Sequence, residues 1–336
     1  MNSSSDSHGN GKRFLITGAK GFIGAWIVKR LVERGDWPAI FDVDRQSHRL
    51  SALLTEEQMA RVCFAEGDVT NFEELDRAVA EHGITHLIHL AAVQVPTCAA
   101  NPRLGAQINI IGTLNVFEVA RRRRDLIERV VYASSAAVFG PEDFYGKSTV
   151  PEGAALEPGT HYGVFKQCNE GNARVFYQAD GISSVGLRPW AVYGVGRDVG
   201  VTSGPTKAIK AAVLGRDYTI RFTGGLDLQY VEDTAEIFLR CAESELPGAR
   251  VYTLRGEVTC MEKFIAALER DSPQAHGRIR AAGPALPIAY DLDNSALIRD
   301  LGQVPSTPLA EGIRETRMIF ERLRDAGRLT TDDLDA

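Results

Sequence analysis

The sequence lacks the features by which membrane-spanning and nucleic-acid-binding chains are usually recognised. No apolar run approaches the ~20 residues that a helix needs to cross a bilayer. Basic residues are not in excess: the formal net charge is -6, so no general attraction to nucleic acid or to an anionic membrane is expected. The one basic run, residues 121–124, falls at the end of an expected helix, where cations offset the helix dipole.

Cysteine and histidine do not form recognisable clusters either. The cysteines stand at positions 63, 98, 168, 241 and 260 without short pairing, which indicates reduced thiols and a cytoplasmic location. His82, His86 and His89 have a spacing that a zinc site would use. Gly83 breaks the helix between them, and on a strand His86 and His89 point to opposite faces. We therefore predict no metal site.

The size of the chain allows a large core. Its 336 residues are 44% hydrophobic, which indicates one large domain or two that share a cleft. Residues 1–11 are rich in Ser, Asn and Gly and lack the apolar stretch of a signal peptide. We interpret them as a disordered tail outside the folded region.

Short apolar runs alternate with helical segments over residues 12–195. Strands are expected at 13–16, 39–42, 62–65, 86–90, 129–133 and 183–188, and helices at 22–34, 72–81, 105–123 and 162–179. This alternation predicts an α/β fold, a Rossmann-type doubly wound parallel sheet with helices on both faces.

After about Val195 the pattern loosens. Short strands are expected at 218–222 and 250–254, and helices at 261–270 and 309–324. We interpret residues 196–330 mainly as a smaller C-terminal α+β lobe that binds substrate, with a segment near 226–250 returning to the first domain.

Gly18, Gly21 and Gly24 form a GxxGxxG turn directly after the first strand and at the start of the first helix. Glycine lets the backbone turn tightly and approach a pyrophosphate, and the helix N-terminus supplies unpaired N–H groups and a positive dipole end. The alternative is a glycine-rich turn with a structural role only.

Two acidic residues follow the next strands. Asp42 ends the second strand, where a carboxylate accepts hydrogen bonds from ribose hydroxyls and disfavours a 2′-phosphate. This favours NAD over NADP, although the nearby Arg45 keeps NADP open. Asp68, followed by Val69, ends the third strand and is either an adenine contact or a plain helix cap.

Tyr162 and Lys166 are four residues apart and therefore share a helix face. A phenol ordinarily titrates near ~10, but a nearby ammonium and a positive nicotinamide ring favour the phenolate. Ser135 ends the preceding strand and is placed to donate a hydrogen bond to the reacting oxygen; strand-end polar filling is the alternative. The combination predicts hydride transfer at a carbon that bears oxygen.

Together these motifs resemble the extended short-chain dehydrogenase/reductases, the NAD-dependent epimerase/dehydratase family. The resemblance extends from about Lys12 to Arg324. It is carried by the segments 17–24, 89–92, 109–113, 134–140, 187–194, 230–233 and 301–313.

The resemblance implies roles for individual residues. Tyr162 is the general acid/base, Lys166 binds the nicotinamide ribose and tunes Tyr162, and Ser135 orients the substrate oxygen. NAD is the implied cofactor, held by Gly18, Gly21, Phe22, Ile23, Gly24, Asp42, Asp68, Val69, Leu90, Ala91, Ala92, Asn109, Tyr162, Lys166 and Val192. The implied substrate contacts are Gln94, Ser135, Ala136 and Trp190. A homodimer is implied through the helices that hold Asn109 and Tyr162.

The sequence departs from nucleotide-sugar epimerases at two places. Ala191 stands where they usually carry an asparagine, and Leu226 where they usually carry an arginine. Neither side chain binds phosphate charge, so we expect a free sugar, polyol or sugar acid. The open alternative is a nucleotide-sugar 4-epimerase with tightly bound NAD, its missing charges supplied by Arg216, Arg221 or Lys207. A cofactor-binding protein without turnover is a third possibility, against which the intact Tyr162, Lys166 and Ser135 argue.

Overall fold

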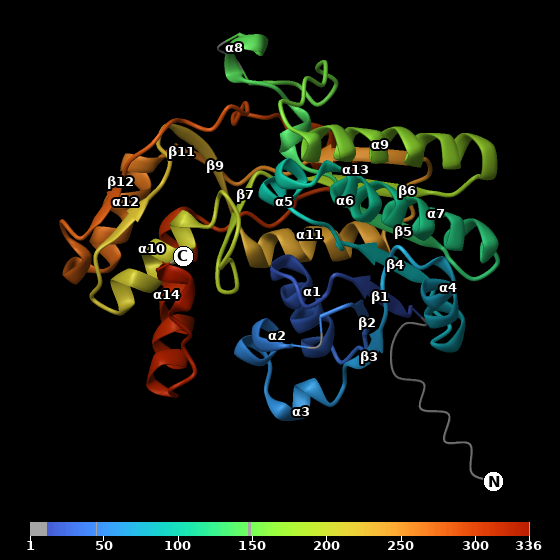
Figure 1. Cartoon of the computed structure of the whole chain (residues 1–336), viewed down its shortest axis with the longest axis horizontal. Helices are drawn as coiled ribbons and strands as arrows, with labels where there is room; N and C mark the ends of the chain where they lie inside the picture. Colours follow the sequence, from blue (N-terminus) through green and yellow to red (C-terminus); the bar gives the residue numbers. More distant parts are fainter. Residues whose placement is uncertain (1–11, 45, 147–148, 336) are drawn as a thin grey trace.

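The computed structural model describes residues 12–44, 46–146 and 149–335 (Figure 1). The expected tail at 1–11 and the NADP-favouring Arg45 lie outside the described residues. Within the described part of the chain, none of the helices combines the length and the apolar character that crossing a bilayer requires.

A seven-stranded parallel sheet with the order β10-β6-β5-β4-β1-β2-β3 forms the centre of the molecule. Its order reverses between β1 and β4, whose Leu15 and Leu87 lie opposite each other. A parallel sheet of this kind binds ligands at the carboxyl ends of its strands beside such a reversal. The fold class predicted from the sequence is thereby confirmed. The strands are β1 (Phe14–Thr17), β2 (Ala39–Asp42), β3 (Cys63–Glu66), β4 (His86–His89), β5 (Arg129–Ala133), β6 (Ser184–Arg188) and β10 (Ala249–Thr253).

Helices cover both faces of this sheet (Figure 1). On one face lie α1 (Phe22–Glu33) and α11 (Val231–Glu243), and on the other α4 (Phe72–Glu81), α7 (Gly112–Arg122) and α9 (His161–Asp180). Separate buried apolar clusters fill the two faces. Short elements complete this region: α2 (His48–Leu53), α3 (Glu56–Met59), α5 (Val95–Ala100), α6 (Pro102–Ala106), η1 (Gln107–Ile111), η2 (Ala136–Val138) and α8 (Glu142–Tyr145).

The helix expected at 105–123 is not one regular α-helix. It consists of α6, one π-helical turn η1, and α7, so the chain holds one extra residue in its middle turn. Asn109 lies in that turn.

Most of the remaining elements form the C-terminal lobe on the left of Figure 1 and the connections to it, whereas α13 lies near α9 and packs against β10 of the central sheet. Two small sheets, β11-β9-β7 and β12-β8, are packed among its helices. The glycine-containing stretch after residue 200, for which no helix was predicted, contains the buried helix α10. The bounds are β7 (Ala191–Tyr193), α10 (Gly204–Val213), β8 (Tyr218–Ile220), β9 (Gly225–Tyr230), β11 (Glu257–Cys260), α12 (Met261–Asp271), η3 (Pro273–Ala275), β12 (Ile279–Ala281), α13 (Ser295–Leu301), α14 (Leu309–Asp325) and η4 (Asp332–Leu334).

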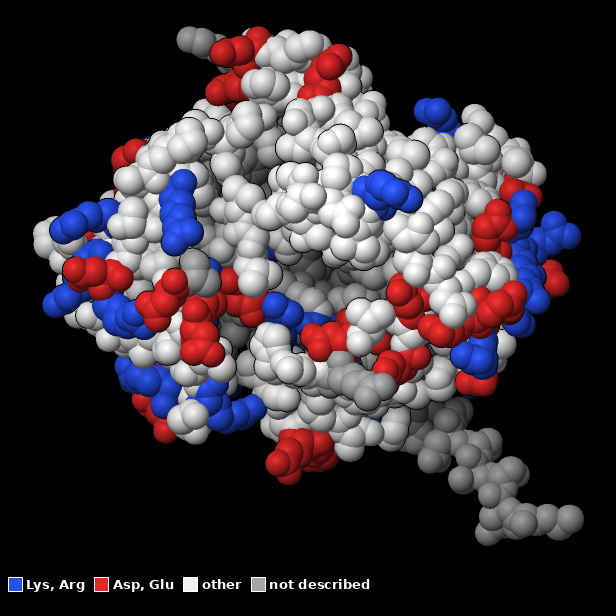
Figure 2. All heavy atoms as spheres, viewed as in Figure 1, with Lys and Arg blue, Asp and Glu red and all other residues white. Residues whose placement is uncertain are grey.

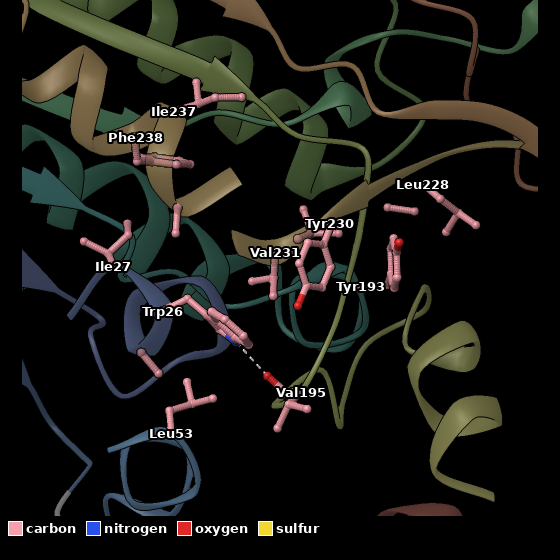
Figure 3. Close-up of a cluster of buried hydrophobic side chains, with 14 of the residues drawn as sticks. Trp26, Ile27, Leu53, Tyr193, Val195, Leu228, Tyr230, Val231, Ile237 and Phe238 are labelled. Atoms are coloured by element: carbon pink, nitrogen blue, oxygen red, sulfur yellow. Dashed lines mark hydrogen bonds between the residues drawn. The ribbon is translucent and has the colours of Figure 1, made fainter. Parts of the chain in front are cut away.

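Trp26 joins the sheet to this lobe (Figure 3). It is 1% exposed, and its ring meets that of Tyr230 edge-on at 6.2 Å between centroids. Its indole Nε1 donates a hydrogen bond of 2.9 Å to the carbonyl oxygen of Val195. Because Val195 follows β7, this hydrogen bond ties α1 to the segment of chain between β7 and α10.

Candidate functional site

A cavity of about 700 Å³ opens at the carboxyl ends of the central strands, between the sheet and the C-terminal lobe. Figure 2 shows a hollow near the centre of this face of the molecule. The structure gathers most of the predicted site residues on its wall: Gly18, Gly21, Phe22, Ile23, Gly24, Asp42, Leu90, Ala92, Gln94, Ser135, Ala136, Tyr162, Lys166, Trp190 and Val192. The predicted residues Asp68, Val69, Ala91 and Asn109 are not part of this wall.

The turn between β1 and α1 requires glycine. Gly18 has φ +67°, and a Cβ there would lie 2.6 Å from the backbone nitrogen of Ala91. A Cβ on Gly24 would lie 2.6 Å from the Cα of Ala19. Gly21 precedes α1, and no side chain caps the helix end. Any residue larger than glycine would fill the space in this turn. The first N–H groups of α1 remain available to a pyrophosphate. The turn therefore fits a dinucleotide.

Asp42 is held at the rim of the same cavity by backbone groups. Its Oδ2 accepts a hydrogen bond of 3.0 Å from the N–H of Lys20, and its Oδ1 accepts one of 3.0 Å from the N–H of Asp44. Both bonds tie the carboxylate to the nucleotide turn and to the end of β2, where a ribose hydroxyl would meet it.

Asp68 and Val69 have structural partners instead. The Oδ1 of Asp68 accepts a hydrogen bond of 2.8 Å from the N–H of Thr70, in the turn before α4, whose N-cap is Asn71. Val69 is 5% exposed and packs closely against Gly112.

Asn109 acts through the loop after β4. It is 1% exposed, its Oδ1 accepts a hydrogen bond of 2.8 Å from the N–H of Val93, and its Nδ2 donates one of 2.9 Å to the Val93 carbonyl. Ala92 and Gln94, on either side of Val93, line the cavity. Asn109 thus fixes the backbone of a cavity wall without being exposed on it.

The residues predicted to be catalytic converge where α9 begins. Thr160 caps this helix, and Gly163 allows it to approach η2, because a Cβ there would lie 2.1 Å from the carbonyl oxygen of Ala137. Lys166 Nζ lies 5.5 Å from the centroid of the Tyr162 ring and donates a hydrogen bond of 2.6 Å to the carbonyl oxygen of Ala133. Ser135 follows the end of β5, lines the same cavity as Tyr162 and lowers the pKa of its phenol.

The electrostatics of Tyr162 differ in part from the expectation. Burial raises the pKa of its hydroxyl above the ordinary value, and the interaction with Ser135 and the positive charge of Arg197 offset only part of that rise. The protein cation that acts on the phenol is therefore Arg197. Lys166 has a separate property: burial lowers the pKa of its ammonium to about 8.

A buried ion pair supports this arrangement from behind. Glu170, on α9, accepts hydrogen bonds from Arg188 Nε at 2.8 Å and Nη2 at 2.7 Å. It also accepts one of 2.6 Å from the hydroxyl of Ser134. These contacts join α9 to the ends of β5 and β6, next to Ser135.

Several residues of the wall lie outside the motifs of the sequence. Arg197 follows the recognised 187–194 segment, and Arg49 and the apolar stretch 286–288 belong to no motif. In the sequence Arg197 is a single cation between Gly196 and Asp198, and no motif marks it. Phe22 and Tyr162 lie far from Arg197 in the sequence, so only the folded structure shows that the three residues are neighbours.

The histidines that the sequence analysis excluded from metal binding have other partners. The ring nitrogens of His89 are hydrogen-bonded with Thr17 at 2.7 Å and Thr113 at 3.0 Å, and burial lowers its pKa to about 3. His86 is 3% exposed, and burial lowers its pKa to about 4. Among the described residues, no three potential ligands gather around one point.

The model of the NAD dependent epimerase/dehydratase family matches residues 14–254. The UDP-glucose 4-epimerase of Mycolicibacterium smegmatis is 28% identical over 92% of this chain and 98% of its own. A partial consensus L-threonine 3-dehydrogenase has a similar solved structure, with a TM-score of 0.82 and 25% identity over 92% of this chain and 99% of its own. The UDP-glucose 4-epimerase of Thermus thermophilus, solved with NAD, gives a TM-score of 0.74 and 26% identity over 92% of this chain and 98% of its own. The chain therefore belongs to the NAD-dependent epimerase/dehydratase family and is an NAD-dependent enzyme.

Proposed function

We propose that the enzyme transfers a hydride between NAD and a secondary alcohol or ketone of a small sugar-like substrate: a free sugar, a polyol or a sugar acid. The observation that carries the proposal is the convergence of Tyr162, Lys166 and Ser135 in one cavity above the nucleotide turn. Hydride transfer assisted by these three side chains requires only a carbon that bears a hydroxyl or carbonyl oxygen. The rest of the cavity wall then determines which substrate is accepted.

That wall offers little to a nucleotide diphosphate. Leu226 is 1% exposed inside β9, and Ala191 is equally buried in β7. Of the cations considered as replacements, Arg216 pairs with Asp335, and neither Arg221 nor Lys207 lines the cavity. The far wall is apolar, formed by Trp190 and residues 286–288. A small substrate suits this wall better than a diphosphate does.

The cofactor would be held by the turn Gly18–Gly21–Gly24, with Asp42 favouring NAD over NADP and Lys166 on the nicotinamide ribose. When bound, NAD supplies the hydride acceptor. In the oxidising direction, Tyr162 Oη takes the proton of the substrate hydroxyl, and Ser135 holds the same oxygen in place. Trp190 closes the far side: its Nε1 donates a hydrogen bond of 2.9 Å to the carbonyl oxygen of Ala289, and its N–H donates one of 3.1 Å to Gln229.

The test is a screen for NAD reduction over polyols, aldoses and sugar acids, with nucleotide sugars alongside. Tyr162→Phe should lower turnover roughly 10²–10⁴-fold while NAD binding, followed by calorimetry, persists. Tyr177→Phe, on the exposed part of the same helix, is the matched control and should be active. Full turnover in Tyr162→Phe would refute the proposed role.

A nucleotide-sugar 4-epimerase is the second candidate, favoured by the 28% identical relative from M. smegmatis. It predicts purified protein that retains NAD tightly and interconverts UDP-sugars without net change at the NADH absorbance band. Net NADH formation with a small alcohol would decide against it.

We also propose a homodimer and a cytoplasmic location. The dimer would use the outer face of α9 and η1, where Val164, Val175 and Ile111 are 46%, 56% and 38% exposed. The location is supported by the unpaired state of the cysteines. Val175→Asp should yield a monomer in light scattering, whereas Val43→Asp, another exposed valine, should leave the mass unchanged.

A further inference from the structure

Among the described residues, the cavity wall carries the cationic side chains Lys20, Arg49, Lys166 and Arg197. Of these, only Arg197 is bound neither to a carboxylate nor to a backbone carbonyl oxygen. It lies on the connection between β7 and α10, and its Cζ is 5.8 Å from the centroid of the Phe22 ring. Its Nη2 donates a hydrogen bond of 2.8 Å to the hydroxyl of Thr202. Arg197 and Tyr162 line the same cavity, and the positive charge of Arg197 lowers the pKa of the phenol.

Asp198, the carboxylate that acts on this guanidinium, forms its ion pairs with other side chains. The adjacent Asp198 pairs with Arg49 at 2.6 Å and with His48 at 3.4 Å. In the described part of the chain, no carboxylate comes within 4.0 Å of Arg197, and its Nε is buried without a hydrogen-bond partner. An unpaired charge held away from water is costly, so a fold retains it where a ligand completes the pair.

The space beside Arg197 is polar and suited to a small group. A Cβ on Gly200, whose φ is +97°, would lie 2.1 Å from Gln94 Oε1 and 3.3 Å from Arg197 Nη2. The side chains of Gln94 and Arg197 therefore converge over Gly200, where any larger residue would collide with Gln94. This corner belongs to the same cavity as Ser135 and Tyr162.

We propose that Arg197 binds a carboxylate of the substrate, so that the enzyme acts on a hydroxy acid, such as a sugar acid, and oxidises a secondary alcohol within a few carbons of that carboxylate. The inference rests on the proposed function and narrows its substrate class. A guanidinium fork matches the two oxygens of one carboxylate. The three other cations of the wall are already engaged: Lys20 with the carbonyl oxygen of Asp44, Lys166 with that of Ala133, and Arg49 with the carboxylate of Asp198.

One guanidinium is also too little for a nucleotide diphosphate. The cofactor's own pyrophosphate has the helix N-terminus at Gly21 to receive it. Arg197 is left for the substrate, and a contact with the cofactor instead becomes an outcome of the test.

The experiment compares four- to six-carbon aldonates with the alditols of matching stereochemistry as reductants of NAD, for wild type, Arg197→Met, Arg197→Lys and Arg221→Met. Wild type should prefer an aldonate over its alditol. Arg197→Met should lower kcat/KM for the aldonate roughly 10²–10³-fold and abolish the preference, because the carboxylate loses its paired charge. Arg197→Lys should retain part of it. Arg221→Met removes an exposed arginine outside the cavity and should behave as wild type.

Calorimetric titration of each variant with NAD alone separates the substrate role from a cofactor role. The NAD dissociation constant of Arg197→Met should stay within about threefold of wild type, an effect of less than ~1 kcal/mol. If that variant instead loses NAD affinity, or loses aldonate and alditol turnover equally, the inference is overturned. If alditols or nucleotide sugars reduce NAD but no aldonate does, the carboxylate-binding role of Arg197 is overturned while the proposed hydride transfer stands. Absence of NAD reduction with every compound overturns the proposed function itself.

Discussion

The pair of Glu170 and Arg188 should be the most sensitive structural support of the active site. Both side chains are less than 10% exposed, at 8% and 7%, and the carboxylate accepts two hydrogen bonds from the guanidinium and one from Ser134. In Glu170→Gln, Arg188 keeps its charge but loses the carboxylate that balances it. Removing one partner of a buried pair costs about 3–5 kcal/mol, so the free energy of unfolding should fall by that amount.

Urea unfolding followed by circular dichroism measures this loss. The control is Glu118→Gln, which removes a carboxylate from an exposed pair with Arg121 and should cost less than about 0.5 kcal/mol. The double variant Glu170→Leu/Arg188→Met should be less destabilised than the sum of the two single changes, because no charge is left buried alone. Equal losses in Glu170→Gln and Glu118→Gln would refute the reasoning.

Three further outcomes follow from the structure. Gly18→Ala should abolish NAD binding in calorimetry and lower the melting temperature, because its Cβ would lie 2.6 Å from a backbone nitrogen, whereas Gly35→Ala, with φ +88° but open space around it, should cost only about 1–2 kcal/mol and bind NAD normally. The pKa of His89 is near 3 when folded and 6.5 when unfolded, so the unfolded chain binds the extra proton between these values. Stability is therefore full above pH 6.5 and should fall by up to about 1.4 kcal/mol per pH unit as the pH drops towards 3, less steeply in His89→Gln, as urea midpoints at pH 7, 6 and 5 would show. Asn109→Ala should lower kcat/KM about tenfold or more by releasing Val93, with a thermal shift that Asn115→Ala does not share.

Local pattern predicted the sheet well. The strands at 39–42 and 129–133 and the helix at 72–81 have the predicted bounds, because an apolar run bounded by polar or glycine residues needs no distant partner to be recognised. The cofactor turn was predictable from the spacing of Gly18, Gly21 and Gly24. Gly18 is needed there because its backbone lies against that of Ala91 in the loop after β4.

Features that depend on distant partners were not predictable. Every residue of α10 is buried although the helix contains Lys207 and Lys210, and Lys210 is neutralised by Asp333, far along the chain. The π-helical turn at Asn109 has no sequence signal that separates it from ordinary helix. The role of Arg197 depends on Phe22 and Tyr162, which lie far from it in the sequence and are brought near it only by folding.

The last strand of the central sheet has a consequence for how the chain is made. β10 pairs with β6, Ala249 opposite Ser184, so the sheet's final edge comes from beyond β7, α10 and β9. During synthesis, β6 leaves the ribosome with one side unpaired and must wait until residue 253 has been added. Until then β6 presents an unpaired edge, and unpaired strand edges are sites at which newly made chains associate wrongly.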